Sequence, residues 1–306
     1  MNAIDVIHLM MIGMHMQLTH LASFVDVATT GSFTEAALAR DVSQSAISHA
    51  ISALERELGV TLIERNRTGV IALTAVGERV LVHARAMLAH GDAIAQEAIA
   101  ALGRDSGKLR VGNIRSFVSP RLLAGYLATF RRQHPDIEVT LFEGTMKEVA
   151  GWLDDRTIDV GFVMFPAEGV DATRIAADEL VLVTREDVTV PATISRDHLL
   201  SQDLVMEDAA CVMHVIRRAG WPTSTRTPRV RYQASNTETI LEMVREGIGV
   251  SILPRTMVPE TPLGLTVQRF DPPLQVEIGL AVRSTTSASW AARQFIAAVA
   301  SWSWLR

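Results

Sequence analysis

A cluster of hydrogen-bonding side chains occupies one face of a predicted helix near residue 45. The cluster consists of Ser43, Gln44, Ser45, Ser48 and His49. Apolar residues at helical spacing flank it: Ile47, Ile51, Leu54 and Leu58. A helix fits the major groove of DNA, where glutamine can bond adenine and serine can bond either kind of base edge. An ordinary solvated helix face would carry the same residue types, so two interpretations compete.

An arginine-rich turn follows this helix. Arg65 and Arg67 lie between short apolar runs that predict two strands, and such a hairpin would form a wing. Their guanidinium groups would contact the DNA backbone or a minor groove, whereas the alternative is a solvated charged hairpin. Thr34, in the preceding predicted helix, is a further candidate for a phosphate contact, and its alternative role is a helix cap.

A second group of candidate binding residues follows predicted strands or opens predicted helices. Its members are Arg115, Ser116, Thr145, Phe165, Met206 and Asn236. Ser116 and Thr145 would place hydroxyls beside helix N-termini, which suit a carboxylate or another anion, and Arg115 would add positive charge. The structural alternative is that these are turn residues, and Ser235 and Glu238 have the spacing of a capping box.

The sequence offers no candidate residues for catalysis. It contains neither a plausible nucleophile triad nor a carboxylate pair, and its nine histidines show no metal-ligand spacing with cysteine. Cys211 is the single cysteine, so a redox sensor would lack a resolving partner. We expect a binding protein, not an enzyme, with no metal and no cofactor.

The composition is typical of a globular cytoplasmic protein. Hydrophobic residues make up 48% and charged residues 21% of 306, and no apolar run is long enough to span a membrane. The N-terminus lacks the basic region and cleavage site of a signal peptide, and the single cysteine fits a reducing compartment. Residues 1–15 are expected to be an unstructured extension, because Met1, Met10, Met11, Met14 and Met16 are alternative starts.

The charge balance counts against a nucleic-acid partner. The net charge is −5, and residues 1–103 carry 6 Lys+Arg against 10 Asp+Glu, a balance of −4. The other 203 residues carry 23 against 24, a balance of −1. A DNA-binding interpretation therefore depends on where a few arginines lie, not on global charge.

Residues 16–74 are predicted to form an all-α winged helix-turn-helix domain. Its first helix ends at Gly31, and its second begins near Ser32. Ser43 is a good N-cap for the third helix, which ends at Gly59. Two helices joined by a turn of three or four residues form a helix-turn-helix.

Residues 75–103 contain no proline and are predicted to form one long linker helix. A stripe with four-then-three spacing runs along it: Val80, Ala84, Met87, Gly91, Ile94, Ala98 and Ala101. Such a stripe is typical of a coiled-coil seam between two copies of a chain, and packing on the helix's own domain is the alternative. A linker at 103–108 follows.

From residue 108 onward, predicted strands and helices alternate. This alternation favours parallel sheets with helical cover. Two such Rossmann-like units would form a bilobed effector domain over 108–306, with lobe I at about 108–184 and 280–306 and lobe II at about 185–279. A cleft is expected between the lobes, at the carboxyl ends of the strands.

Residues 24–77 resemble the N-terminal domain of LysR-type transcriptional regulators. The matching elements are Gly31-Ser32-Phe33, Ala36-Ala37, Val42-Ser43-Gln44, Ser48, the LERELG run, Arg65, Leu73-Thr74 and Gly77. The runs LRVG at 109–112, IDVGFV at 158–163 and EGIGVSILP at 246–254 fall where that family has effector-domain strands. The resemblance therefore covers about residues 16–300.

The resemblance implies a homodimer through the linker helix and usually a homotetramer. It also implies a small-molecule effector bound between two lobes similar to those of periplasmic binding proteins. The chain departs from the family pattern at His49, where arginine is frequent, at Ser45, where proline is frequent, and at Ile63, where phenylalanine is frequent. His49 weakens the expected phosphate or guanine contact, Ser45 is expected to alter the base preference, and Ile63 changes only packing.

We therefore expect a sequence-specific transcriptional regulator whose binding or bending of promoter DNA is modulated by a small-molecule effector, with an anion favoured. A contact with RNA polymerase is a further expectation, and a membrane partner is not expected. The alternative is a small-molecule-binding protein whose N-terminal helices serve only oligomerisation. The effector, the target genes and the direction of regulation do not follow from the sequence.

Overall fold

The computed structural model describes residues 16–65, 71–103, 105–115, 117–189, 191, 194, 198–199, 201–207 and 229–300. The predicted extension at 1–15, a predicted helical stretch at 209–220 and Cys211 lie outside these residues. The chain divides into two compact units, Met1–Ala95 and Gln96–Arg306.

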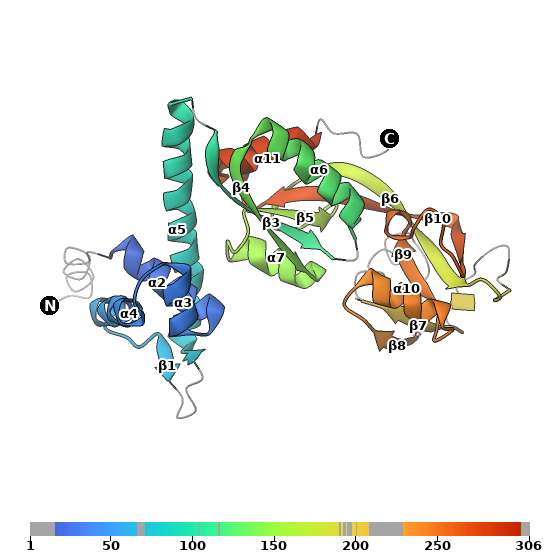
Figure 1. Ribbon diagram of the computed structural model, residues 1–306, viewed down its shortest axis with the longest axis horizontal. Helices are drawn as coiled ribbons and strands as arrows, with labels where there is room; N and C mark the ends of the chain where they lie inside the picture. The colour runs from blue at the N-terminus through green and yellow to red at the C-terminus, as the bar shows by residue number, and fades with distance from the viewer. Residues whose placement is uncertain are drawn as a thin grey trace. The chain divides into compact units, whose positions relative to one another are not determined.

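Figure 1 shows the helices and strands of both units. The first unit contains α2 (Leu18–Thr30), α3 (Phe33–Ala39), α4 (Gln44–Leu58), β1 (Ile63–Arg65), β2 (Ile71–Leu73) and most of α5 (Ala75–Ala101). The second unit contains β3 (Ser106–Ile114), α6 (Pro120–Gln133), β4 (Asp136–Gly144), α7 (Met146–Asp154), β5 (Val160–Met164), β6 (Asp171–Arg185), β7 (Asp203–Met206), β8 (Arg229–Gln233), α10 (Thr237–Arg245), β9 (Ser251–Pro254), η1 (Arg255–Met257), β10 (Leu265–Val282), η2 (Thr285–Ser287) and α11 (Trp290–Ala300).

The three helices before β1 begin and end at residues suited to those positions. Ser32 and Ser43 cap α3 and α4, because each side chain accepts a hydrogen bond from the backbone N–H three residues later. Gly31 and Gly59 end α2 and α4 with φ of 67°, a left-handed conformation that glycine adopts without steric cost. The three helices pack around one apolar core that includes Phe24, whose side chain is fully buried.

The wing is attached to α4 by one carboxylate. β1 and β2 pair antiparallel, and the Oε1 atom of Glu55 accepts hydrogen bonds from the backbone N–H groups of Leu62 at 2.7 Å and Ile63 at 3.2 Å. At Gly77 in α5, an added Cβ would lie 2.2 Å from the carbonyl oxygen of Leu62. Only glycine therefore allows α5 to pass this close to the wing.

The apolar stripe along α5 is divided into two parts. Ala84 is buried in the core of the first unit, and Val80 packs against that core. Met87 and Ile94 expose 40% and 71% of their surface, and Ala98 is exposed as well. Packing on the helix's own domain therefore accounts for the first part of the stripe and leaves the second part uncovered in a single chain.

The main sheet of the second unit is mixed, so the expectation of parallel sheets was wrong for half of it. The strand order is β4-β3-β5-β10-β6-β9. β3 pairs parallel with β4 and β5, whereas β10 pairs antiparallel with β5 and β6, and β6 pairs antiparallel with β9. A separate sheet pairs β7 with β8 in parallel. The long strand β10 lies between β5 and β6 in this sheet and runs antiparallel to both. These pairings do not have the parallel geometry that a helical crossover between neighbouring strands would produce.

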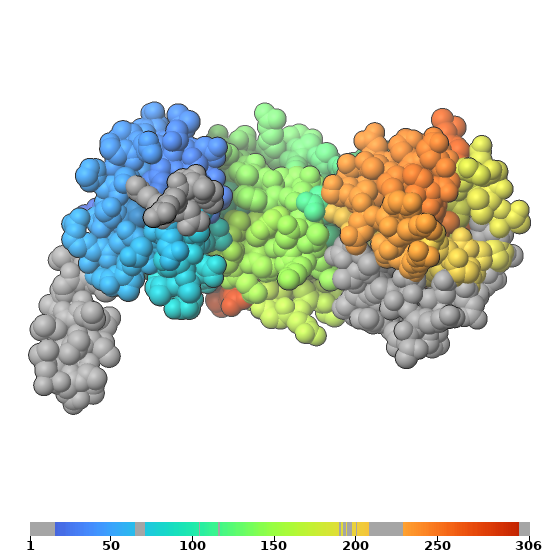
Figure 2. All heavy atoms as spheres, turned by 90° about the horizontal axis from the view of Figure 1, so that it is seen from below, coloured from blue at the N-terminus to red at the C-terminus, as the bar shows by residue number. Residues whose placement is uncertain are grey.

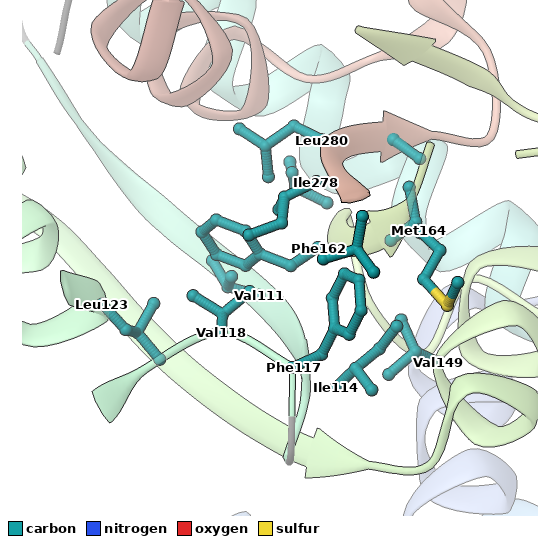
Figure 3. Close-up of a cluster of buried hydrophobic side chains, with 14 of the residues drawn as sticks. Val111, Ile114, Phe117, Val118, Leu123, Val149, Phe162, Met164, Ile278 and Leu280 are labelled. Atoms are coloured by element: carbon teal, nitrogen blue, oxygen red, sulfur yellow. The ribbon is translucent and has the colours of Figure 1, made fainter. Parts of the chain in front are cut away.

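The two faces of β6 serve two cores. Leu180 and Leu182 point into the larger core, which includes residues from β3, β5 and α6. Val181 and Val183 point into a smaller core with the apolar face of α10. This alternation follows from the two-residue period of a strand, and it lets one strand support both lobes. Figure 3 shows part of the larger core, where Phe162 lies among Val111, Ile278 and Leu280.

The last turns of α5 belong to the second unit through a buried glutamine. Gln96 is 6% exposed, its Nε2 donates to the carbonyl oxygen of Lys108 at 3.0 Å, and its Oε1 accepts from the N–H of Ala291 at 3.2 Å. β3 begins at Ser106, inside the segment predicted to be a linker at 103–108. The connection between α5 and β3 is therefore shorter than the sequence indicated.

Candidate nucleic-acid interface and effector site

The polar face of α4 is presented to solvent as predicted. Gln44, Ser45 and His49 are exposed, Ser48 is half-buried, and Ile47 is 1% exposed on the opposite face. Because Ile47 anchors the helix in the core, the polar residues lie in its first two turns with fixed backbone positions. The N-terminus of a helix carries partial positive charge, which suits contact with phosphate even where few cations are present.

Two serines at the start of α4 are engaged with each other. The Ser43 and Ser45 hydroxyl oxygens lie 2.8 Å apart, and Ser43 also accepts from the backbone N–H of Ala46 at 3.2 Å. Ser43 is thus a helix cap, and Gln44 and His49 are exposed polar side chains of the same helix. Thr34 is exposed within α3, and the cap of that helix is Ser32, so Thr34 is not a cap.

Of the two wing arginines predicted to contact DNA, the structure describes one. Arg65 is the last residue of β1, and Arg67 lies outside the described residues. A nearby basic side chain is partly neutralised, because Nη1 of Arg40 lies 3.0 Å from Oδ2 of Asp26. Glu55 was not among the predicted site residues, and it acts on the wing by holding β1 against α4. Its membership of the LERELG run was the only signal for it.

In the second unit, Arg115 joins the ends of two strands. It follows β3, and its Nε donates to Oε1 of Glu207, which follows β7, at 2.6 Å. Nη1 donates to the carbonyl oxygen of Glu143 at 3.0 Å, and Nη2 lies 3.8 Å from Oε2 of Glu148. The hydrogen bond to Glu207 raises the pKa of the Arg115 guanidinium above its ordinary value. The Glu207 side chain is only 6% exposed and that of Arg115 is 32% exposed, so the carboxylate of this pair is largely removed from water whereas the guanidinium is partly in contact with it.

Thr145 and Asn236 both act as helix caps. Thr145 forms a capping box with Glu148: its hydroxyl accepts from the N–H of Glu148 at 3.3 Å, and Glu148 accepts from the N–H of Thr145 at 2.7 Å. The backbone N–H of Thr145, and then its hydroxyl, act on the Glu148 carboxylate and lower its pKa. Asn236 accepts from the N–H of Thr239 at 2.7 Å and caps α10, so the predicted capping box between Ser235 and Glu238 was wrong.

The remaining predicted effector residues differ in how deeply they are buried. Met206 is buried, with 3% of its surface exposed, whereas Phe165 is half-buried at the end of β5. Ser116 lies outside the described residues. The helix that Asn236 caps, α10, falls in the orange part of the surface in Figure 2. Sequence reasoning missed Glu207, although its position directly after a buried strand, next to Met206, was a usable signal.

Membrane and metal features are both lacking in the described part of the chain. None of the helices described here is long and apolar enough to cross a membrane. No group of three or more His, Cys, Asp or Glu side chains in the described ranges is arranged to hold a metal ion.

Comparisons with known proteins cover both units. Residues 18–78 match the bacterial regulatory helix-turn-helix proteins of the lysR family, and residues 102–304 match the LysR substrate binding domain. The uncharacterized HTH-type transcriptional regulator YvbU from Bacillus subtilis is 34% identical over 288 residues, which span 92% of this chain and 97% of YvbU.

Solved structures agree with this match. A full-length OxyR variant from Pseudomonas aeruginosa has a TM-score of 0.72 and 25% identity, covering 95% of this chain and all of that one. Full-length CbnR in complex with its target DNA has a TM-score of 0.61 and 25% identity, covering 92% of this chain and 98% of that one. The winged helix-turn-helix, the long α5 and the two-lobed substrate-binding domain therefore make this chain a member of the LysR family of transcriptional regulators.

Proposed function

We propose that this protein is a cytoplasmic regulator that reads specific promoter DNA through α4 and its wing. The exposed polar face of α4 over a buried apolar face carries this proposal. The residues assigned to DNA are Thr34, Ser43, Gln44, Ser45, Ser48, His49, Arg65 and Arg67. The solved complex of full-length CbnR with its target DNA, to which 92% of this chain is similar, supports this assignment.

The uncovered part of α5 supports a dimer. Met87, Ile94 and Ala98 continue the stripe begun by Val80 and Ala84, and they are exposed in one chain. A second copy of α5 would bury them, and the small side chains would allow close approach of the two helices. Such a dimer brings two copies of α4 to two half-sites, and two dimers would make the homotetramer expected of the family.

The effector would bind where the ends of β3 and β7 meet. Arg115, Ser116, Thr145, Phe165, Met206 and Asn236 are assigned to this site. Because Arg115 is already paired with Glu207, an anionic effector must compete with that carboxylate for the guanidinium. An effector that replaces Glu207 would break a bond between the two strand ends, and this difference would couple binding to a change in the domain. No enzymatic role is proposed.

The test is fluorescence anisotropy of the full-length protein on DNA from upstream of its own gene, with scrambled DNA for comparison. Gln44→Ala and Ser48→Ala are each expected to weaken selective binding by about 1–3 kcal/mol, which is the discrimination provided by one good base contact. Gln133→Ala on α6, an exposed glutamine in the other unit, is the matched control and should bind as the wild type does. Retained selectivity in both α4 variants would refute the assignment.

The same experiment distinguishes the proposed regulator from the alternative function. A small-molecule-binding protein whose N-terminal helices serve only oligomerisation would bind both DNAs equally weakly, with or without the substitutions.

A further inference from the structure

A pocket of about 660 Å³ opens beside α7 in the first lobe of the effector domain. Ile114, Leu153, Val163 and Met164 line it from the core side, and each has less than 9% of its surface exposed. Ala150 contributes to the wall from the exposed side of α7. Figure 3 shows Ile114 close to Phe117 and Val149 at one end of the buried cluster.

The size and lining of this pocket suit a small apolar molecule. Ligand pockets in proteins typically enclose 300–1,000 Å³ and are lined mainly by hydrophobic side chains with a few polar groups at defined places. Here the polar groups are the side chains of Lys147, Asp154 and Glu168. The apolar part of a ligand would cover core residues, and its polar part would meet these charges.

The pocket adjoins the proposed effector site along the chain but shares none of its described residues. All of its lining residues come from the segment 114–170, so one lobe builds it completely. None of the described residues assigned to the effector lines it: Arg115, Thr145, Phe165, Met206 and Asn236 are absent from its walls. It therefore does not require the meeting of β3 and β7 that the effector site depends on.

Three charged side chains line the pocket, the cation Lys147 and the carboxylates Asp154 and Glu168. Asp154 forms an ion pair with Arg283, so its charge is compensated. Within the described part of the chain, Lys147 has no ion-pair partner, and it lies in the first turn of α7, where the helix dipole adds positive potential. The long aliphatic stem of a lysine can also lie over an apolar surface while its ammonium group stays in water. Glu168 is the lining carboxylate that no described ion pair compensates, and it lies in the segment between β5 and β6, away from the first turn of α7 in the sequence.

From this geometry we propose that the pocket beside α7 binds an apolar monocarboxylate, with the ammonium group of Lys147 as the partner of the carboxylate. The site goes beyond the effector site of the proposed function and does not depend on DNA binding. Figure 2 views the molecule from the side on which α7 lies, in the green part of the surface.

The experiment measures binding of octanoate and its neutral analogue octanamide to the full-length protein by ligand-observed NMR. Ala150→Phe fills the pocket and is expected to weaken octanoate binding about tenfold or more, because an enlarged side chain cannot share the same space. Ala128→Phe, at an exposed alanine of α6 in the same lobe, is the matched control and should leave the affinity unchanged.

Two charge variants test the carboxylate. Lys147→Gln is expected to weaken octanoate binding about fivefold, the effect of one partly exposed ion pair, and to leave octanamide binding unchanged. Glu168→Gln is expected to leave octanoate binding unchanged or slightly stronger. The reverse pattern, with Glu168→Gln weakening binding and Lys147→Gln not doing so, would overturn the assigned chemical class.

Two further results would overturn the site itself. The first is octanoate binding that Ala150→Phe does not weaken, because the compound would then bind elsewhere. The second is the absence of octanoate binding, because a pocket covered by a second copy of the chain would not admit it. None of these measurements contains DNA, so they are independent of the outcome for α4.

Discussion

The carboxylate of Glu55 provides the most quantitative prediction, because it holds the wing to α4. Its Oε1 atom accepts from the N–H groups of Leu62 at 2.7 Å and Ile63 at 3.2 Å, and both of these residues are buried. A hydrogen bond to a charged group contributes about 1.5–3 kcal/mol, and a buried donor left without a partner costs about 1–3 kcal/mol. Since the two bonds share one oxygen, we expect Glu55→Ala to destabilise the wing by about 2–4 kcal/mol.

Glu55→Gln separates charge from geometry. A glutamine can keep an acceptor oxygen at the same place, and neutral hydrogen bonds contribute about 0.5–1.5 kcal/mol, so the loss should be about half as large. The assay is hydrogen exchange at the amides of Leu62 and Ile63, since a whole-chain unfolding midpoint is poorly defined for a protein of two units. Glu64→Ala, at an exposed side chain of β1, is the control and should change exchange little.

DNA affinity is a second measurement on Glu55→Ala, and it distinguishes the loss of the wing position from the simple loss of a negative charge. Removing a negative charge near DNA would by itself raise affinity. If the wing position matters, Glu55→Ala should instead lower affinity, because Arg65 at the end of β1 is no longer held in place. Unchanged amide exchange in Glu55→Ala, or affinity that rises, would refute the reasoning.

Three further predictions concern packing, a buried amide and pH. Gly77→Ala should destabilise the first unit by about 1–3 kcal/mol, measured by hydrogen exchange at the buried amides of that unit, because its Cβ would lie 2.2 Å from the Leu62 oxygen. Gln96→Ala should destabilise the second unit by about 2 kcal/mol, measured by hydrogen exchange at the buried amides of that unit, since the buried N–H of Ala291 and the carbonyl of Lys108 lose their partner. Glu148 has a pKa lowered by the N–H and hydroxyl of Thr145, so its stabilisation is present above the ordinary glutamate pKa of 4.5 and is lost as pH falls through the folded value. Glu148→Gln should therefore reduce the acid sensitivity of stability below pH 4.5, and unchanged sensitivity would contradict this.

Local sequence signals were sufficient for the helix-turn-helix. The caps at Ser32 and Ser43 and the left-handed glycines at Gly31 and Gly59 depend on neighbours within a few residues, and all four were predicted correctly. The exposed face of α4 followed in the same way, because Ile47 and its helical repeats fix which side is buried.

Long-range pairing was not accessible from local signals. β10 runs from Leu265 to Val282, and its full length could not be predicted from local signals, because Pro272 and Pro273 interrupt the apolar run. Its antiparallel pairing with β6 joins segments about ninety residues apart. Strand–helix alternation predicts parallel neighbours only where the connection is a helix.

The candidate sites also divide into those predictable from local sequence and those that depend on long-range contacts. The polar residues of α4 could be selected from spacing alone, whereas the partner of Arg115 could not. Glu207 is 92 residues away along the chain, and only the fold brings its carboxylate within 2.6 Å of the guanidinium. The split of the α5 stripe likewise depends on which part of the helix the first unit covers.

The most direct test of sequence readout by α4 is selection from a pool of random DNA duplexes by the full-length protein, because the operator need not be identified beforehand. We predict enrichment of an interrupted palindrome whose half-sites lie about 10 base pairs, or a multiple of this, apart. We also predict that Ser48→Ala and Gln44→Ala change or abolish the enriched half-site. No enrichment by the wild type, or the same motif from both variants, would contradict sequence readout by α4.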